Sequence, residues 1–251
     1  MHNVLWLRTR QPSPTVDLPV LPESLPARMR GLPVLEPERC PDGCRACAAV
    51  CPTQAIETAP LRIDLARCVF CNECVRACPE QAIQFTRDYR LAASGRDRLV
   101  VGDGHALARE LGGKLRSLLG RSLKLRAVCA GSCNGCEAEL QALGNVVFDL
   151  GRYGIQFVAS PRHADGVVVT GPVTRAMEEA LRMTWEAVPE PRIAIAVGAC
   201  ALSGGPFRGH AEQLDGADRV LPIDLYVPGC PPHPLTILDG LLRLVGRLKP
   251  A

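Results

Sequence analysis

The stretch "LKLRAVCAGSCNGCEAELQAL", residues 123–143, joins a strand-like run to a helical run through a loop that carries two cysteines. Cys133 and Cys136 are separated by two residues in that loop. Two thiols at this spacing suit a redox pair, half of a zinc site, or half of an iron–sulfur site whose other ligands lie elsewhere. The sequence on either side of the stretch decides among these three chemistries.

The same alternation of strand-like and helical runs continues to the end of the chain. Strand-like runs are "GVVVTG" (166–171), "RIAIAVGAC" (192–200) and "LPIDLYVPG" (221–229), and helical runs are "TRAMEEALRMTWEAV" (174–188) and "HPLTILDGLLRLVGRL" (233–248). This pattern predicts an α/β fold with an open, mainly parallel sheet, whose functional loops lie at the carboxyl ends of the strands. Because Cys133, Cys136, Cys200 and Cys230 each follow a predicted strand, we expect them to gather at that edge.

Residues 40–86 contain an internal repeat. The segment "CPDGCRACAAVCPTQAI", residues 40–56, returns as "CVFCNECVRACPEQAI", residues 68–83, and duplication of one small metal-binding unit is the simplest explanation. "LRIDL", residues 61–65, reads as a short strand between the copies, and the end of each copy predicts a helix stop followed by a strand. These patterns predict a small α+β domain of the bacterial two-cluster ferredoxin type.

The cysteine spacing in the second copy favours 4Fe-4S clusters. Cys68, Cys71, Cys74 and Cys78 follow the bacterial ferredoxin run, in which three close cysteines bind one cluster and the fourth reaches the other. A zinc knuckle is the alternative, and the duplication makes it the weaker one. Crossed ligation therefore predicts two 4Fe-4S clusters in this domain.

The first copy has one extra residue in its first gap, so we expect a widened loop that still ligates. If either ferredoxin cluster is absent or altered, we expect it to be the one bound there. The first cluster is predicted on Cys40, Cys44, Cys47 and Cys78, and the second on Cys68, Cys71, Cys74 and Cys51.

Five of the thirteen cysteines remain, and a third 4Fe-4S cluster needs four thiolates. Cys133 and Cys136 are close enough to bind one cluster. Cys200 and Cys230 follow glycines, which let backbone amides approach and hydrogen-bond the sulfurs. Cys129 lies within the strand before the pair, and we expect a buried bystander thiol there rather than a ligand.

Composition narrows the class of partner. Lys and Arg are dispersed, the net charge is +3 and only 4% of residues are aromatic, which argues against a nucleic-acid partner. No run approaches the roughly 18 apolar residues of a spanning helix, and the first residues lack the order of a signal peptide. Many cysteines without such a signal favour metal ligation over disulfides, so we expect a cytoplasmic protein.

Four segments are predicted along the chain. Residues 1–39 contain seven prolines and form a floppy tail or an arm that wraps a partner. Residues 40–90 form the ferredoxin-like domain, 91–119 a basic linker and 120–251 the α/β domain. The linker predicts an amphipathic helix, either a packed connector or a surface that docks on lipid or a partner. The apolar residues that recur at helical spacing in this linker are Leu107, Leu111, Leu115 and Leu118.

Several motifs resemble one family. The chain is similar to the small subunit of the membrane-associated, energy-converting nickel–iron hydrogenases, the group with formate hydrogenlyase and the carbon-monoxide-linked hydrogenases. That family is homologous to the terminal-cluster subunit of respiratory complex I. The resemblance covers about residues 120–245 and lies in "AGSCNGCEAEL" (130–140), "SPRHADGVVVTGPVT" (160–174), "VGACALSGG" (197–205) and "YVPGCPPHP" (226–234).

The resemblance implies a flavodoxin-like fold and a proximal 4Fe-4S cluster, the third in the chain, on Cys133, Cys136, Cys200 and Cys230. The complex I subunit carries two adjacent cysteines where this chain has a pair separated by Asn134 and Gly135, and this spacing favours the hydrogenase branch. Residues 40–90 resemble a two-cluster ferredoxin-like subunit that is usually a separate chain. The fusion would fix the distance between clusters that exchange electrons.

The resemblance further implies an electron-transfer subunit of an oxidoreductase complex, not catalytic alone. Electrons would pass through the ferredoxin clusters and the proximal cluster to or from a catalytic large subunit that holds nickel and evolves or takes up hydrogen. Other implied partners are membrane antiporter-like subunits and an upstream donor dehydrogenase or ferredoxin, with this chain peripheral on the cytoplasmic side of the inner membrane. Two alternatives stay open: a nickel-free, quinone-reducing complex I-like assembly, and a free polyferredoxin-like carrier.

For each of three side chains near the expected ligands, the sequence leaves two roles open. Glu137 and Glu139 either relay protons or are surface or capping acids at the start of a helix. His233, close to Cys230, is expected to support a ligand or contact a partner rather than bind metal.

Overall fold

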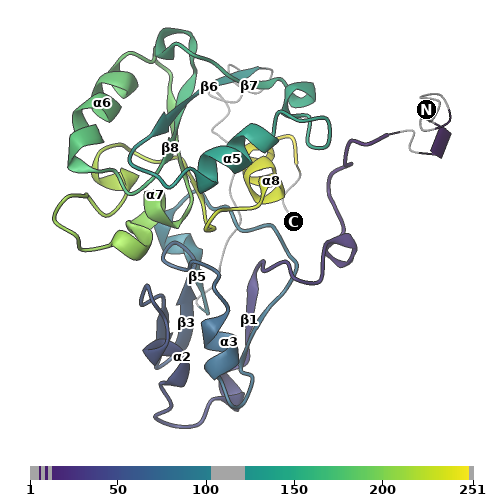
Figure 1. Cartoon of the computed structure of the whole chain (residues 1–251), viewed down its shortest axis with the longest axis vertical. Coiled ribbons are helices and arrows are strands. Elements are labelled where there is room, and N and C mark those ends of the chain that lie inside the picture. Colours follow the sequence, from purple (N-terminus) through teal and green to yellow (C-terminus); the bar gives the residue numbers. More distant parts are fainter. Residues whose placement is uncertain (1–5, 7–8, 11–12, 103–121, 249–251) are drawn as a thin grey trace.

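The computed structural model describes residues 6, 9–10, 13–102 and 122–248, which form a larger and a smaller unit (Figure 1). The strands of the larger unit are β6 (Leu123–Cys129), β7 (Ile155–Phe157), β8 (Gly166–Thr170), β9 (Ile193–Val197) and β10 (Leu225–Val227). They form one five-stranded sheet in the order β10-β9-β8-β6-β7, with every neighbouring pair parallel. Read from β7 and counted within this unit, the order is 2-1-3-4-5, as in flavodoxin-like sheets, and the predicted α/β fold is confirmed.

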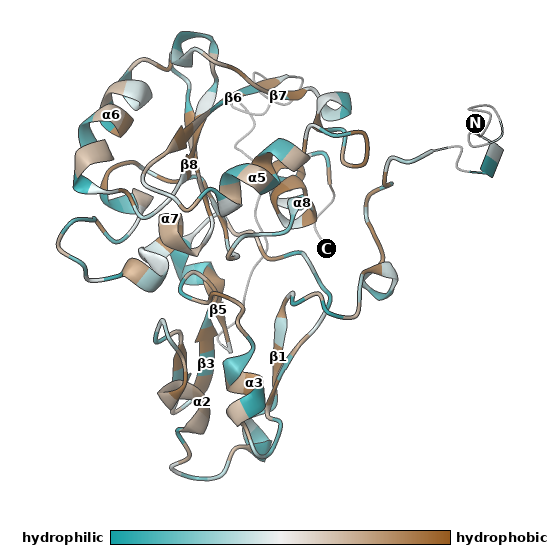
Figure 2. Ribbon diagram, viewed as in Figure 1, coloured by the Kyte–Doolittle hydropathy of each residue, from teal (hydrophilic) through white to brown (hydrophobic). Residues whose placement is uncertain are grey.

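Helices cover both faces of the sheet (Figure 1). The helices are α5 (Gly135–Ala142), α6 (Arg175–Glu186), α7 (Ala199–Ser203) and α8 (Pro234–Leu244). Along β8 the side chains alternate: Val168 packs with residues of α5 and α8, whereas Val167 and Val169 belong to the core that includes Leu181 of α6. Apolar residues concentrate in the strands and in α8 (Figure 2), as expected for a parallel sheet covered on both faces.

The smaller unit contains two antiparallel sheets and two short helices. Strands β1 (Pro33–Leu35) and β4 (Ile83–Phe85) form one pair, and β2 (Ile56–Thr58), β3 (Leu61–Asp64) and β5 (Val100–Val101) form the second sheet. Helices α2 (Ala46–Ala49) and α3 (Glu73–Ala77) occupy equivalent places in the two copies of the repeat. Strands β2, β3 and β4 lie where the sequence predicts them. This unit is therefore the small α+β domain expected from the repeat.

The two units share a buried boundary. The Ser203 hydroxyl, at the end of α7, donates a hydrogen bond to the Ala66 carbonyl at 2.8 Å. Ala93 and Tyr226 exchange two backbone hydrogen bonds of 3.0 and 2.8 Å, which extends the edge of the large sheet by one bridge. One continuous apolar core runs from Leu61 in the smaller unit to Leu202 in the larger one. The smaller unit is thus fixed beneath the α7 end of the sheet (Figure 1).

Before β1 the chain runs as an extended arm. The Val16 amide donates to the Val147 carbonyl at 2.9 Å, and the Val20 amide donates to the Tyr89 hydroxyl at 2.9 Å, so the arm touches both units. The amphipathic helix predicted around residues 105–118 lies outside the described residues. In the described ranges no helix combines the length and apolarity needed to cross a bilayer. Short 3₁₀ turns lie at Pro22–Ser24, Pro37–Arg39, Arg96–Leu99, Leu150–Tyr153, Pro161–His163, Gly205–Phe207 and Ala217–Arg219.

Candidate metal centres

Two small cavities in the smaller unit are each lined by four cysteines. Each set takes three cysteines from one copy of the repeat and one from the other. One cavity is lined by Cys51, Cys68, Cys71 and Cys74, and the other by Cys40, Cys44, Cys47 and Cys78. The sets are those that crossed ligation predicts, and ligation itself stays a prediction. In the described part of the chain, no three His, Cys, Asp or Glu side chains converge on a single-ion site.

The first gap of the first copy holds one residue more than that of the second, and the cysteines on both sides of it still line the cavity. The Cys44 amide donates to the Pro41 carbonyl at 3.1 Å, which closes a turn inside the longer gap. Cys40 and Cys44 both line the cavity. The expected widening of the loop stays a prediction.

Backbone amides point at sulfurs in both cavities. Cys51 and Cys78 are the cysteines that each copy of the repeat contributes to the other copy's set. The Ala55 amide donates to Cys51 Sγ at 3.2 Å, and the Ala82 amide donates to Cys78 Sγ at 3.3 Å, so in both sets the donor lies four residues after this cysteine. The Phe70 amide donates to Cys68 Sγ at 3.4 Å. Hydrogen bonds of this kind stabilise a negatively charged cluster and raise its potential.

Burial makes isolated thiolates unfavourable in these cavities. It is the main cause that raises the pKa of Cys68 to about 12, and with the Cys71 thiolate it raises the pKa of Cys74 to about 11. Thiolates bind metal in deprotonated form, and positive iron ions offset both the burial cost and the mutual repulsion. Four soft donors, buried or half-buried, around an apolar-walled cavity fit a 4Fe-4S cluster.

A third set of cysteines lies at the carboxyl edge of the large sheet. Cys133 and Cys136 flank the start of α5, Cys200 is in α7 after β9, and Cys230 follows β10. Burial, followed by the charges of Cys200 and other neighbours, raises the pKa of Cys136 to about 12. Burial and the charges of Cys230 and Cys133 raise the pKa of Cys200 to about 11. The four thiols therefore lie within electrostatic reach of one another, at the edge that the sequence predicts.

Gly198 leaves room for this set. Its φ is +90°, and a Cβ at this position would lie 2.4 Å from Cys136 Sγ. Any side chain here would displace a predicted ligand, and its backbone conformation also disfavours one. The Gly198 requirement is not visible in the sequence, because it depends on how α7 and α5 approach each other.

The side chain of Cys129 is exposed, whereas the sequence predicted a buried one. It is the last residue of β6 and its side chain is exposed, so the prediction of a buried thiol was wrong. The neighbouring Val128 and Ala130 are buried, so the Cys129 side chain alone is exposed here, and its sulfur lies 3.5 Å from the Ser132 hydroxyl. Cys129 belongs to none of the three sets, and its proposed bystander role stays a prediction.

Glu137 lies in a hydrogen-bonded network beside the third set. Its Oε1 accepts hydrogen bonds from the Ser132 hydroxyl at 2.5 Å and from the Thr170 hydroxyl. Its Oε2 is buried and, within the described residues, has no hydrogen-bond partner. Burial alone would raise the pKa of Glu137, but the bonds from Ser132 and Thr170 outweigh it and lower that pKa. Thr170, the polar residue that ends an apolar strand, is the signal that sequence reasoning overlooked.

The other two candidate residues have different surroundings. Glu139 is half-buried, and burial raises its pKa. His233 Nδ1 accepts a hydrogen bond from the Leu235 amide at 3.1 Å, so this side chain caps the first turn of α8. Proline at the first helical position after His233 was the sequence signal for this cap.

Each of the two units matches a known protein family. Residues 133–244 match the family described as NADH ubiquinone oxidoreductase, 20 Kd subunit, and residues 61–84 match the 4Fe-4S binding domain. Formate hydrogenlyase subunit 7 of Escherichia coli (strain K12) is 44% identical over 129 residues, which cover 51% of this chain and 51% of that protein. The chain therefore spans about half the length of this relative.

Of two further relatives, one is named as a hydrogenase subunit and the other as an NADH-quinone oxidoreductase subunit. The probable membrane-bound hydrogenase subunit mbhJ of Pyrococcus furiosus is 42% identical over 135 residues, which cover 54% of this chain and 81% of that protein. A subunit of the NADH-quinone oxidoreductase of Desulfovibrio desulfuricans is 48% identical over 109 residues, which cover 43% of this chain and 59% of that protein.

Proposed function

Because the chain belongs to the family of the NADH ubiquinone oxidoreductase 20 Kd subunit and also carries a 4Fe-4S binding domain, we propose that it is the iron–sulfur electron-transfer subunit of a membrane-associated nickel–iron hydrogenase. The matched relatives include subunits named for formate hydrogenlyase and for a membrane-bound hydrogenase. In this proposal the chain conducts electrons, and a separate large subunit holds nickel and performs the hydrogen chemistry.

The observation that carries the proposal is the arrangement of twelve cysteines in three sets of four. Two sets line cavities in the smaller unit, and the third lies at the carboxyl edge of the large sheet. We assign one 4Fe-4S cluster to each set. Bound clusters supply reversible one-electron transfer. The protein contributes thiolate ligands, amide hydrogen bonds to sulfur and apolar walls that exclude water.

The boundary between the units supports an order for the three centres. Ser203, three residues after Cys200, donates its hydrogen bond to Ala66, which is two residues before Cys68. The set with Cys68 is therefore the part of the ferredoxin-like unit that adjoins the helix carrying Cys200. We assign the middle position to this set and the outer position to the set with Cys40.

The Cys133–Cys136 spacing favours the hydrogenase branch over a nickel-free, quinone-reducing assembly, although relatives from both branches match. We further propose a large catalytic subunit as the partner at the Cys133 edge, membrane antiporter-like subunits elsewhere in the complex, and a peripheral position on the cytoplasmic side of the inner membrane. A free polyferredoxin-like carrier is the remaining alternative.

The test is the metal content of the native complex, purified anaerobically through a tag on this chain. We expect nickel together with about twelve irons per copy of the chain, as three 4Fe-4S clusters require. Iron without nickel would replace the hydrogenase proposal with the quinone-linked one. Recovery of the chain without any partner would leave only the carrier.

A further inference from the structure

Asp64 ties together two segments that contribute cysteines to the set with Cys68. The Asp64 carbonyl accepts a hydrogen bond from the Cys68 amide at 3.0 Å. The Asp64 amide donates to the Ala55 carbonyl at 2.8 Å, and the Ala55 amide in turn donates to Cys51 Sγ at 3.2 Å. One residue is therefore linked to a cysteine from each copy of the repeat, and both cysteines line the same cavity.

Two arginines hold the Asp64 side chain. Arg96 Nη1 donates to Asp64 Oδ1 at 2.8 Å and Arg96 Nη2 donates to Oδ2 at 2.6 Å, so the guanidinium binds both carboxylate oxygens at once. Arg67 Nε lies 3.3 Å from Asp64 Oδ2. The Asp64 side chain is only 18% exposed. A two-point contact between charged groups fixes the direction of the carboxylate as well as its distance.

The loop that follows Asp64 contacts the larger unit. Asp64 Oδ1 also accepts a hydrogen bond from the Ala66 amide at 3.0 Å. The Ala66 carbonyl accepts the bond from Ser203 of α7, and Ser203 lies three residues after Cys200. The carboxylate that Arg96 binds therefore also holds the residue that meets the helix carrying a cysteine of the third set.

Arg96 lies on a second segment that contacts the larger unit. It begins the 3₁₀ turn that precedes β5. Ala93, three residues earlier, exchanges two backbone hydrogen bonds with Tyr226 in β10. Cys230 of the third set follows that strand, four residues after Tyr226. The pair formed by Arg96 and Asp64 thus joins two segments of the smaller unit, one in contact with α7 and the other with β10.

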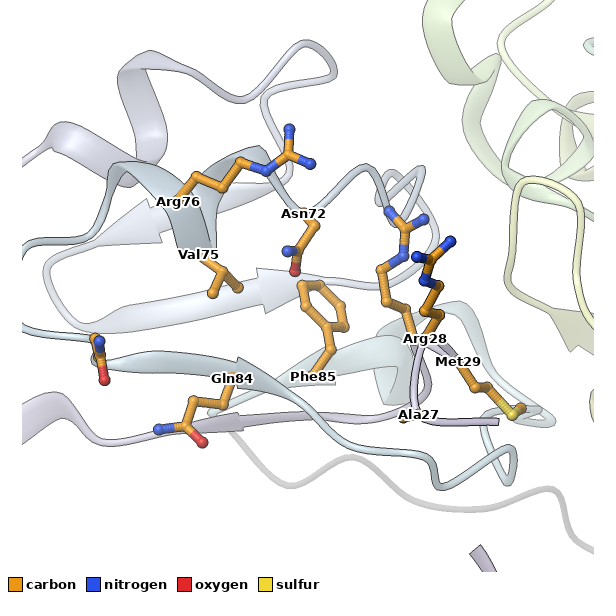
Figure 3. A pocket seen from close by; sticks show the side chains of 10 residues that line it. Ala27, Arg28, Met29, Asn72, Val75, Arg76, Gln84 and Phe85 are labelled. Carbon is orange, nitrogen blue, oxygen red and sulfur yellow. The ribbon is translucent and has the colours of Figure 1, made fainter. Parts of the chain in front are cut away.

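Another wall of the cavity of the Cys68 set borders an open groove instead of the larger unit. Asn72 and Phe85 line both the cavity and the groove, and Figure 3 shows the Phe85 ring beside the Asn72 side chain. All ten residues that line the groove lie between positions 27 and 85, in the arm and the smaller unit. The position of the set relative to the larger unit therefore depends on the contacts around Asp64 rather than on this wall.

We propose that Asp64, held by Arg96, is a positioning residue that sets the distance between the Cys68 set and the third set. The inference rests on the proposed function, since it assumes a cluster on each of these two sets. In each transfer, one electron leaves the reduced cluster of one set as the oxidised cluster of the other gains it. The rate of such a transfer falls steeply with distance. A carboxylate outside the cavity lining therefore governs the rate by fixing the loop that carries a ligand.

The experiment compares D64N with the unmodified protein, each as the native complex purified anaerobically. Asparagine keeps the shape and an oxygen acceptor but loses the charge that binds both guanidinium nitrogens. The magnetic coupling between the middle and proximal clusters, measured as splitting of their electron paramagnetic resonance signals, should weaken. Hydrogen added to the oxidised complex should reduce the two ferredoxin clusters about tenfold more slowly. Iron should stay at about twelve per chain.

R96K tests the same pair from its other side and leaves the hydrogen bond from the Ala66 amide to Asp64 in place. Lysine keeps the charge but lacks the planar fork that binds two oxygens. The coupling and the reduction rate should therefore change in the same direction as in D64N, by a smaller amount. If D64N fails to assemble, R96K alone decides.

D88N is the matched control. Arg90 binds Asp88 through two hydrogen bonds of 2.8 and 2.6 Å, and the Asp88 side chain is 19% exposed, close to the value for Asp64. The segment from 86 to 92 carries no cysteine. D88N should therefore leave the coupling and the reduction rate unchanged.

An unchanged coupling in R96K or in an assembled D64N, or an equal change in D88N, would overturn the inference. Loss of about four irons in both variants would overturn it as well, because Asp64 would then retain a cluster rather than set a distance. Iron and nickel in the unmodified complex test the proposed function separately. Missing metal there refutes the proposed function, whereas full metal with unchanged coupling in the variants refutes the role of Asp64 alone.

Discussion

Gly198 is the residue whose substitution most directly tests the third centre. A Cβ at this position would lie 2.4 Å from Cys136 Sγ, too close for any real contact. We expect G198A to lose the cluster at the sheet edge, with iron falling from about twelve to about eight per chain. Iron analysis and electron paramagnetic resonance of the purified complex measure this loss.

Gly209 provides the matched control. Its φ is +79°, so alanine is strained there too, but no atom lies within 4 Å of an added Cβ. G209A should therefore keep about twelve irons. Full iron in G198A, or the same loss in both variants, would mean that steric room beside Cys136 does not govern the centre.

Crossed ligation can be tested by combining cysteine substitutions. C51A alone should lower iron by up to about four per chain. Since Cys51 lines the cavity of Cys68, C51A/C68A should lose no more than about four irons in total. C51A/C40A should lose about eight, because Cys40 lines the other cavity. The reverse pattern would show that each copy of the repeat binds its own cluster.

At the scale of single elements, a half-buried carboxylate links β9 and β10. Asp224 Oδ2 accepts a hydrogen bond from the Ala194 amide at 2.9 Å, and burial raises its pKa above the usual 3.8 despite that bond. An acid with a raised folded-state pKa binds its proton more tightly when folded, so ionisation at neutral pH lowers the stability of these strands.

D224N removes that ionisation while keeping an oxygen that can accept from Ala194. We expect the strands to be more stable by roughly 1 kcal/mol at pH 7. This advantage should shrink as pH falls through the raised pKa toward 3.8. Amide hydrogen exchange of β9 and β10, compared between the two proteins at each pH, measures it. An advantage that grows at low pH would contradict the assignment.

Strongly patterned elements could be predicted from the sequence, and short ones could not. The runs that became β8 and β9 are continuous and apolar, and buried parallel strands need that composition. β7 is a three-residue edge strand with two exposed residues, so it carries no such pattern. Helix α7 has five residues, too few for helical periodicity to be recognised. Its ends are set by Gly198 and Gly204 within the fold.

For the whole molecule, cysteine spacing predicted which sulfurs share a cavity but not how the two units meet. Spacing within a repeat is local information, and the crossed sets follow from it. The contact of Ser203 with Ala66 joins residues 137 positions apart and has no local signature. The hydrogen bond from the Gly31 amide to the Thr86 carbonyl, which holds the arm beside the end of β4, likewise joins residues far apart in the sequence. Long-range packing of this kind decides the relative positions of the three cysteine sets.

The Ser203–Ala66 hydrogen bond is the contact through which this arrangement can be tested. Ser203 is buried, and its hydroxyl also lies 3.2 Å from the Ala199 carbonyl in its own helix. In S203A the Ala66 carbonyl loses its partner at a buried site, which should cost about 1–3 kcal/mol. We expect faster hydrogen exchange at the Cys68 amide, next to the lost contact, with no change in iron content.

Thr184 supplies the comparison for this variant. Its hydroxyl donates to the Ala180 carbonyl at 2.7 Å, but the bond is exposed and lies within α6. T184A should therefore leave the Cys68 amide unchanged, because water replaces the lost partner and the units do not meet there. If S203A behaves like T184A, the shared apolar core alone holds the units together. If only S203A loosens the Cys68 segment, the polar contact helps to fix the cysteine set with Cys68 beside Cys200.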